Sequence, residues 1–194
     1  MLPSVVFSTI LLTSVVWAQI PDQFTSGFNN NTISLVVTYG ANKVTDGEKL
    51  SLNVVKSSPT LALGDSSSLN TNSRYIVIMI DPDAPSRANP TAANFLHWVK
   101  TDLRIRSSTA TNITADNATA AFSYLSPAPV QGSGPHRYTF LLFDQPRRDG
   151  FVLQGLPAND LPASRVGFNV SAWMVVNGLA PAKAGTYFLA EFEG

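Results

Sequence analysis

The chain alternates short apolar runs with connections rich in proline and glycine, a pattern typical of β proteins. Five segments run apolar or alternate between apolar and polar positions in the manner of strands: residues 33–39, 75–80, 95–100, 138–143 and 186–192. Helical spacing is rarer. The best helix candidate is residues 170–177, followed by Gly178, and a weaker one is residues 160–166. We therefore predict a mainly β fold with a large sheet and one or two short helices.

Two stretches rich in Ser, Thr, Asn and Ala, residues 57–73 and 107–121, predict loops. Neither has enough apolar residues to fold as a unit of its own. No internal repeat and no domain-sized linker divides the chain of 194 residues. We expect a single domain over residues 19–194, large enough to bury about 70 % of its unfolded surface.

The first eighteen residues predict a secretory signal peptide. An apolar run from Val5 to Val16 precedes the small residue Ala18, where cleavage is expected. The run is short and rich in Ser and Thr for a membrane span. No Lys or Arg precedes Lys43, however, and a signal peptide usually begins with positive charge. An N-terminal strand or a buried helix is the alternative. We predict a protein that is secreted or lies in the secretory lumen, without a transmembrane span.

Sites for N-glycosylation fit this localisation. Four N-x-S/T sequences predict glycosylation at Asn30, Asn112, Asn117 and Asn169. Asn169 is also the residue expected to cap a helix over residues 170–177, so its side chain has two candidate uses. Only 13 % of the residues are charged, against about 25 % in ordinary soluble domains. Glycans would supply the missing polarity, and a chain without cysteine depends on its core rather than on disulfides.

Charge and motifs narrow the classes of function. Lys and Arg together number 13 and balance 13 Asp and Glu, so no basic surface favours nucleic acid as a partner. The chain has no phosphate-binding P-loop, no G-x-S-x-G sequence and no cysteine nucleophile. It also lacks the H-x-[DE] pair of an iron triad. We predict no metal and no cofactor.

The candidate chemistry lies at the ends of predicted strands. His97 and His136 are the two histidines of the chain, and each stands next to a strand-like run. Asp81 and Asp83 follow the run of residues 75–80. If these three strands are neighbours, two imidazoles and one carboxylate share a cleft that can hold an anion. The carboxylate of Asp81 would then accept a proton from a histidine nitrogen or from loop N–H groups.

A hydroxyl from Tyr124 or Tyr138 would complete such a cleft. The alternative for each histidine is a purely structural role in the core. Spacing along the chain does not bring these residues together, since they are far apart in sequence.

Four motifs are similar to those of the phosphatidylethanolamine-binding protein family: "DPDAPSR" (81–87), "LHWV" (96–99), "SPAPVQGSGPHRYTFLLF" (126–143) and "AGTYFLAEF" (184–192). The resemblance implies a large central antiparallel sheet flanked by a smaller sheet and short helices, with an anion pocket at one end. The motifs place the pocket at Asp81, Ala84, Pro85, His97, Pro129, His136 and Tyr138. Members bind phosphate, phosphorylethanolamine or acetate-like groups there.

Other residues of these motifs look like scaffold or departures. Arg87 and Arg137 are expected to tie loops to neighbouring carbonyls or carboxylates. Ser126 and Val130 stand where many members have glycine and proline, which is expected to reshape the edge of the pocket.

Three functions remain open at this point. The first is a secreted binding protein for a small ligand bearing phosphate or carboxylate. The second is an accessory enzyme, since the family includes secreted fungal proteins that assist dimerisation and ring closure of maleic-anhydride polyketides. His97, His136 and Asp81 would then be the catalytic residues, in general acid–base chemistry. The third is an inhibitor of a serine carboxypeptidase, as in some fungal relatives.

Overall fold

The computed structural model describes residues 33–64, 70–107, 111–115, 120–146 and 151–194. Five antiparallel strands form a large sheet in the order β6-β5-β4-β7-β8. In chain order these are β4 (Tyr75–Asp81), β5 (Phe95–Ile105), β6 (Ile113–Ala115), β7 (His136–Asp144) and β8 (Ala184–Ala190). This is the mainly β architecture that the sequence predicts.

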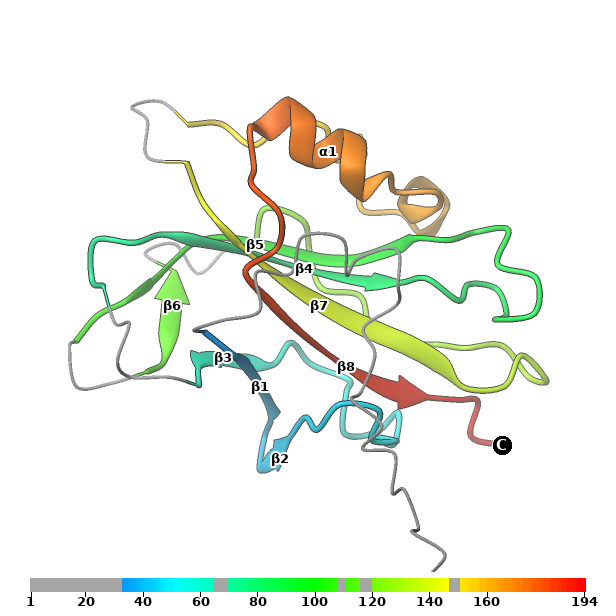
Figure 1. The fold of residues 1–194 in the computed structure, drawn as a ribbon. Helices are drawn as coiled ribbons and strands as arrows, with labels where there is room; N and C mark the ends of the chain where they lie inside the picture. The colour runs from blue at the N-terminus through cyan, green and yellow to red at the C-terminus, as the bar shows by residue number, and fades with distance from the viewer. Residues whose placement is uncertain (1–32, 65–69, 108–110, 116–119, 147–150) are drawn as a thin grey trace, which may run out of the picture.

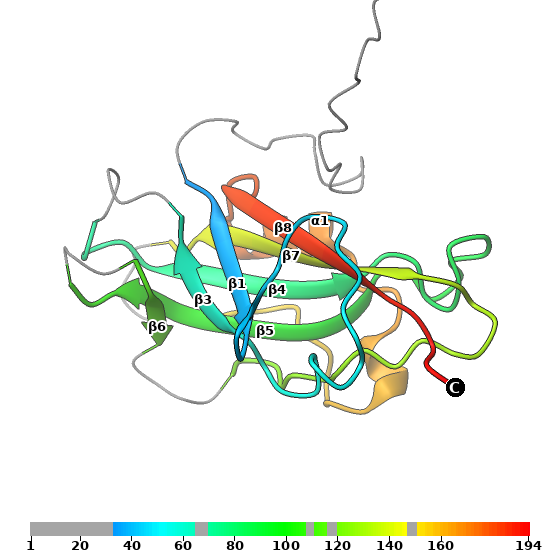
Figure 2. The same ribbon diagram turned by 90° about the horizontal axis from the view of Figure 1, so that it is seen from below.

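A second, smaller sheet covers one face of the large one. Its order is β2-β1-β3, and its strands are β1 (Leu35–Tyr39), β2 (Asn42–Lys43) and β3 (Thr60–Leu63). Figure 1 shows this sheet on one side of the large sheet and the helix α1 (Val170–Asn177) on the other. Seen from below, β1 and β3 cross the large sheet at an angle (Figure 2). The described chain is therefore layered as small sheet, large sheet and helix.

Strand β4 is central because it is apolar on both faces. All seven of its residues are buried. Val77 and Met79 belong to the core between the two sheets, whereas Ile76 and Ile78 belong to the core beneath α1. Successive side chains of a strand point to opposite faces, so an uninterrupted apolar run serves two cores at once.

Helix α1 begins and ends as the sequence predicts. The side-chain oxygen of Asn169 accepts a hydrogen bond from the Ala172 N–H at 2.9 Å, and Gly178 closes the helix in the left-handed conformation at φ 64°. Trp173 anchors the helix, with its ring 5.7 Å from that of Phe143 on β7. The weaker helical prediction corresponds to a short 3₁₀ helix, η2 (Pro162–Arg165).

Five predicted strands are present, but both loop predictions were incomplete. Residues 57–73 contain β3, and residues 107–121 contain β6. In β3 only Leu61 and Leu63 are buried, so the apolar signal is two residues long and is hidden among polar neighbours. Strand β5 continues to residue 105, beyond the predicted 100, through an irregularity in its pairing with β4 near Asp102, whose φ is positive at 56°.

The predicted signal peptide, residues 1–18, and the glycosylation candidates Asn30 and Asn117 lie outside the described residues. Within the described ranges, no helix has the length and apolar character needed to cross a bilayer.

Candidate functional site

A cavity of about 420 Å³ opens at the end of the large sheet where β4 ends and β5 and β7 begin. Because these neighbouring strands are antiparallel, the end of one lies beside the starts of the other two (Figure 1). All seven residues of the predicted pocket line this cavity: Asp81, Ala84, Pro85, His97, Pro129, His136 and Tyr138. The structure thus brings together residues that are distant in the chain.

His97 reaches the cavity from an irregularity in β5. Met79 on β4 pairs with Trp98, and the next residue, Ile80, pairs with Leu96. His97 is therefore the extra residue of a β-bulge, a feature that redirects a side chain at the edge of a site.

The bulge is held by a buried arginine. Arg165, 1 % exposed, donates from Nη1 to the carbonyl oxygens of Leu96, His97 and Ser123 at 3.0 to 3.1 Å. Arg165 lies in η2, so this helix fixes the backbone of β5 on both sides of the bulge.

The imidazole of His97 is neutral near pH 7. Its Nδ1 donates to the carbonyl oxygen of Leu125 at 2.7 Å. Burial lowers the pKa of His97 to about 4, more than the Leu125 carbonyl and the charge of Asp81 raise it. Because Nδ1 holds the proton of the neutral ring, Nε2 is a hydrogen-bond acceptor until a second proton arrives.

The imidazole of His136 is in the opposite state. Nδ1 donates to Oδ2 of Asp81 at 2.7 Å, and Nε2 lies 3.0 Å from Oγ of Ser133. The Ser133 hydroxyl donates its one proton to the carbonyl of Val130 at 2.7 Å, so it accepts from Nε2. This arrangement accommodates a ring with protons on both nitrogens.

The charge of this ring follows from its partners. Burial lowers the pKa of His136, but the hydrogen bond and charge of Asp81 outweigh burial, and the pKa is raised. The site thus pairs one histidine, whose charged form is favoured by a carboxylate, with a second histidine that is neutral.

Asp83 fixes the loop that follows β4. It is 1 % exposed and accepts from the side chain of Arg137 with both oxygens and from Arg87 with one. Burial raises the pKa of Asp83, and the hydrogen bonds from Arg137 lower it by more, so that the net change is downward. Its backbone N–H donates to Asp81 at 2.8 Å. The expectation that Arg87 and Arg137 serve as scaffold agrees with these contacts.

Tyr138 is the tyrosine that lines the cavity. Its ring centroid lies 5.2 Å from that of His97, edge to face, and 6.3 Å from that of His136, nearly parallel. Burial, followed by the charge of Asp81, raises its pKa, so the hydroxyl stays protonated as a donor. Tyr124 instead donates its hydroxyl to the carbonyl of Val55 at 2.8 Å.

Sequence reasoning missed two polar residues and the apolar part of the site. The partners of Arg165 are carbonyls far away in sequence. Those of Ser133, Val130 and His136, are each three residues away, but a serine in a Gly/Pro loop does not reveal which of them it contacts. The remaining lining is mostly apolar and includes Phe95, Leu125 and Val166, together with the two departures Ser126 and Val130. A ligand with an apolar portion therefore fits better than a bare ion.

Within the described ranges, no group of three or more His, Cys, Asp or Glu side chains lies close enough together to hold a metal ion.

Comparison with known proteins agrees with the fold and the motifs. Residues 25–188 match the phosphatidylethanolamine-binding protein family. The chain is 33 % identical over 165 residues to the protein BROTHER of FT and TFL 1 of Arabidopsis thaliana, covering 84 % of this chain and 83 % of the relative.

Solved structures show the same fold. The carboxypeptidase Y inhibitor, in its complex with the cognate proteinase, superposes with a TM-score of 0.71 at 27 % identity over 84 % of each chain. The phosphatidylethanolamine-binding protein of Plasmodium vivax superposes with a TM-score of 0.70 at 21 % identity, covering 93 % of this chain and 94 % of that one. The chain belongs to the phosphatidylethanolamine-binding protein family.

Proposed function

We propose that the chain is a binding protein for a small ligand with a phosphate or carboxylate group, held in the cavity of His97 and His136. The supporting observation is His136, whose ring is oriented by Asp81 and whose pKa is raised by that carboxylate, so that the charged form is favoured. A charged donor makes stronger hydrogen bonds to an oxyanion than a neutral one does. The apolar lining from Phe95 and Val166 would contact the rest of the ligand.

Binding of an anion should be coupled to proton uptake. The ion pair of His136 and Asp81 carries no net charge, and neutral His97 presents an acceptor at Nε2. An anion cannot accept a hydrogen bond from this nitrogen until it is protonated. The arriving negative charge would raise the pKa of His97 from about 4 toward neutrality, so the anion and one proton would bind together.

Isothermal titration calorimetry with inorganic sulfate near pH 6.5 tests this. Sulfate does not titrate near neutral pH, so any proton taken up comes to the protein. We expect up to about one proton per sulfate, read from buffers of different ionisation enthalpy. His136→Asn should weaken binding about tenfold or more, because a hydrogen bond to a charged group contributes roughly 1.5–3 kcal/mol.

His97→Asn should abolish the proton uptake, while Lys43→Met, which removes an exposed positive charge on β2, should change neither quantity. Sulfate affinity that is equal in wild type and His136→Asn would contradict the proposal.

The enzyme alternative uses the same residues, and the protonation of His97 makes it the weaker proposal. A general base works best when its pKa lies near the working pH. Burial holds the pKa of His97 at about 4 in the empty cavity, which makes its Nε2 a weak base for dimerisation or ring closure of an anhydride polyketide. Binding needs no base, so the low pKa of His97 leaves this role open: the ring takes up a proton from the solvent when an anion arrives, and the affinity then depends on pH.

Inhibition of a serine carboxypeptidase is the second candidate. The observation that favours it is the likeness to the carboxypeptidase Y inhibitor, which was solved bound to its proteinase. Such a function would use the molecular surface and would be compatible with a ligand in the cavity.

A further inference from the structure

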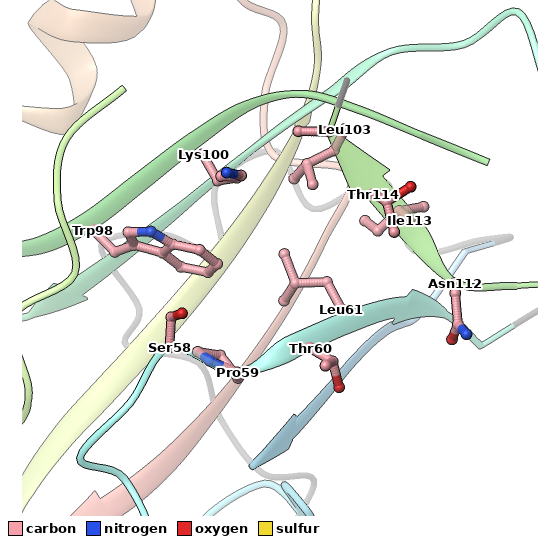
Figure 3. Close-up of a pocket in the computed structure, with 11 residues that line it drawn as sticks. Ser58, Pro59, Thr60, Leu61, Trp98, Lys100, Leu103, Asn112, Ile113 and Thr114 are labelled. Atoms are coloured by element: carbon pink, nitrogen blue, oxygen red, sulfur yellow. The ribbon is translucent and has the colours of Figure 1, made fainter. Parts of the chain in front are cut away.

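The bulge of strand β5 sends two successive side chains to two different cavities. Leu96 and Val99 both belong to the core beneath α1, although residues three positions apart in a regular strand lie on opposite faces. Between them stand His97, which lines the cavity of the two histidines (the histidine cavity), and Trp98. Figure 3 shows Trp98 pointing into a second cavity, of about 360 Å³, between the two sheets. The place of His97 thus depends on one extra residue in β5.

Arg165 binds the backbone at this extra residue. Its Nη1 donates to the carbonyl oxygen of Leu96 at 3.0 Å and to that of His97 at 3.1 Å. These two carbonyls belong to the peptide groups on either side of His97. A bulge disrupts the ladder of hydrogen bonds between strands, and at this position one guanidinium nitrogen ties both peptide groups to η2.

The same guanidinium binds two further segments. Nη1 also donates to the carbonyl of Ser123 at 3.1 Å and Nη2 to the hydroxyl of Ser123 at 3.3 Å, while Nε donates to the carbonyl of Asp160 at 3.0 Å. Leu125 lies two residues after Ser123, and Val166 directly follows Arg165. Leu125 and Val166 both line the histidine cavity. One side chain therefore connects three segments that form walls of this cavity.

Two hydrogen bonds transmit this arrangement to the imidazole. The N–H of Leu125 donates to the carbonyl of His97 at 2.9 Å, and Nδ1 of His97 donates to the carbonyl of Leu125 at 2.7 Å. The orientation of the ring is thus fixed by backbone groups that Arg165 holds together.

This set of acceptors suits an arginine better than a lysine. Arg165 is 1 % exposed, and a buried cation is stable only when its donors are hydrogen-bonded. The planar guanidinium has five N–H donors in a fixed fork, whereas the donors of a lysine all come from one nitrogen. The ring of Phe122 lies against the guanidinium, with Cζ 4.4 Å from the ring centroid. A lysine at this position would keep the charge and lose most of the contacts.

Charged groups act on His97 from three elements. Burial has the largest effect and lowers the pKa of His97 to about 4, while the charge of Asp81 on β4 raises it and those of Arg165 in η2 and His136 on β7 lower it. Tyr138 on β7 contacts the ring and keeps its proton. A ring released from its place would be less buried, so its pKa would rise toward about 6.5.

We propose that Arg165 is a positioning residue for anion binding, which holds the bulge of β5, the segment of Leu125 and η2 together so that the ring of His97 has one orientation in the histidine cavity. Arg165 does not line this cavity itself and acts through His97. The consequence for the anion rests on the proposed function, whereas the orientation of His97 does not.

NMR of protein with ¹⁵N-labelled histidine tests the orientation. In wild type the proton of the neutral His97 ring should lie on Nδ1, where the Leu125 carbonyl accepts it. In Arg165→Lys we expect this proton to exchange between Nδ1 and Nε2, and the pKa of His97 to rise from about 4 toward about 6.5. His136→Asn identifies the signals of His97, because the chain has two histidines.

Asn177→Ala is the matched control. Asn177 is also fully buried and holds two segments, since its side chain donates to the carbonyls of Gln154 and Trp173 at 3.0 and 2.8 Å. None of these three residues lines the histidine cavity. Asn177→Ala should lower the temperature of thermal unfolding and leave the His97 ring as in wild type. A ring that is unchanged in Arg165→Lys, or equally changed in Asn177→Ala, would overturn the proposal.

Calorimetry with sulfate at about pH 6.5 tests the consequence for the anion. We expect the proton uptake per sulfate in Arg165→Lys to be about half that of wild type or less, because a released ring is either protonated beforehand or out of contact with the anion. Uptake equal to that of wild type would contradict the proposal. If wild type binds no sulfate, the proposed function fails, and the NMR result decides whether Arg165 positions His97.

Ser123→Ala replaces Arg165→Lys if thermal unfolding shows that the lysine variant does not fold. It keeps the guanidinium but removes the hydroxyl that accepts from Nη2 and donates to the carboxylate of Asp160. We expect the same change in the His97 ring at a smaller size, and an unchanged ring would then overturn the proposal.

Discussion

His97 and His136 line the same cavity but hold different numbers of protons, and the cause is the partner of each Nδ1. A neutral carbonyl stabilises one N–H of His97 and adds little for the charged form, so burial dominates. A carboxylate stabilises the charged form of His136 directly, and the effect of burial is reversed. The sequence predicts that the two rings meet, but it does not reveal which one has the carboxylate.

The first consequence concerns stability at acid pH. The pKa of His97 is about 4 in the folded protein and about 6.5 in the unfolded chain. The contribution of the neutral ring to the free energy of unfolding is therefore complete above about pH 6.5 and is lost as the pH falls toward 4. Urea unfolding should show a loss of about 2 kcal/mol from this group between about pH 7.5 and pH 5.

His97→Asn should remove this dependence, whatever its effect on stability at neutral pH. His136→Asn is a control in the opposite direction. Because the pKa of His136 is raised, its charged ring stabilises the folded protein at acid pH, and this stabilisation is lost as the pH rises. Asp83 does not interfere in this range, since its lowered pKa matters only at more acid pH. Parallel pH profiles for wild type and His97→Asn would show that the ring is not buried in its neutral form.

At the scale of elements, strands with long apolar or alternating patterns were predictable, including β1 and β8, which bury every second residue. Short strands with one or two buried residues were not. Strand β4 is buried throughout and β7 in seven of its nine positions, so each is a long apolar run. Strands β3 and β6 bury only one or two side chains each, and their polar sequences resemble loops. The bulge at His97 could not be predicted either. It depends on how β5 pairs with β4 and on the hydrogen bond from Arg165 to the His97 carbonyl, and both involve residues distant in sequence.

Helix α1 allows the two uses of Asn169 to be separated. Asn169→Ala removes both the cap and the glycosylation sequence, whereas Asn169→Asp removes only the sequence and keeps an oxygen for the Ala172 N–H. We expect Asn169→Ala to lower the free energy of unfolding by about 1 kcal/mol. Asn169→Asp should equal wild type or exceed it slightly, since a negative charge at a helix N-terminus is favourable.

Chemical denaturation of unglycosylated protein measures both variants. Equal destabilisation by Asn169→Ala and Asn169→Asp would show that the hydrogen bond to Ala172 does not contribute.

At the scale of the whole molecule, strand β5 separates two cavities. His97 lines one and the next residue, Trp98, lines the other. Asn112 lies at the rim of the second cavity and forms a single bridge with Ala62 of the small sheet. It is exposed, as is Asn169. Glycosylation at these positions and secretion stay predictions of the sequence.

Inhibition of a proteinase would depend on the outer surface of the whole molecule. If the chain shares this property with the carboxypeptidase Y inhibitor, purified protein should reduce the hydrolysis of a peptide substrate by carboxypeptidase Y in a saturable manner. His136→Asn should inhibit as well as wild type, since it alters a buried group. Undiminished hydrolysis at a large molar excess of the protein would remove this function from consideration.

The hydroxyl of Ser133 gives the histidine cavity a built-in competitor. It lies within hydrogen-bond distance of the His136 nitrogen that points away from Asp81. Because it belongs to the same chain, it is always present beside the ring. An anion that takes this N–H must exchange places with it, so the measured affinity is the difference between two bonds. Ligands that are poorer acceptors than an alcohol would be turned away, and the residue at position 133 would set the threshold for entry.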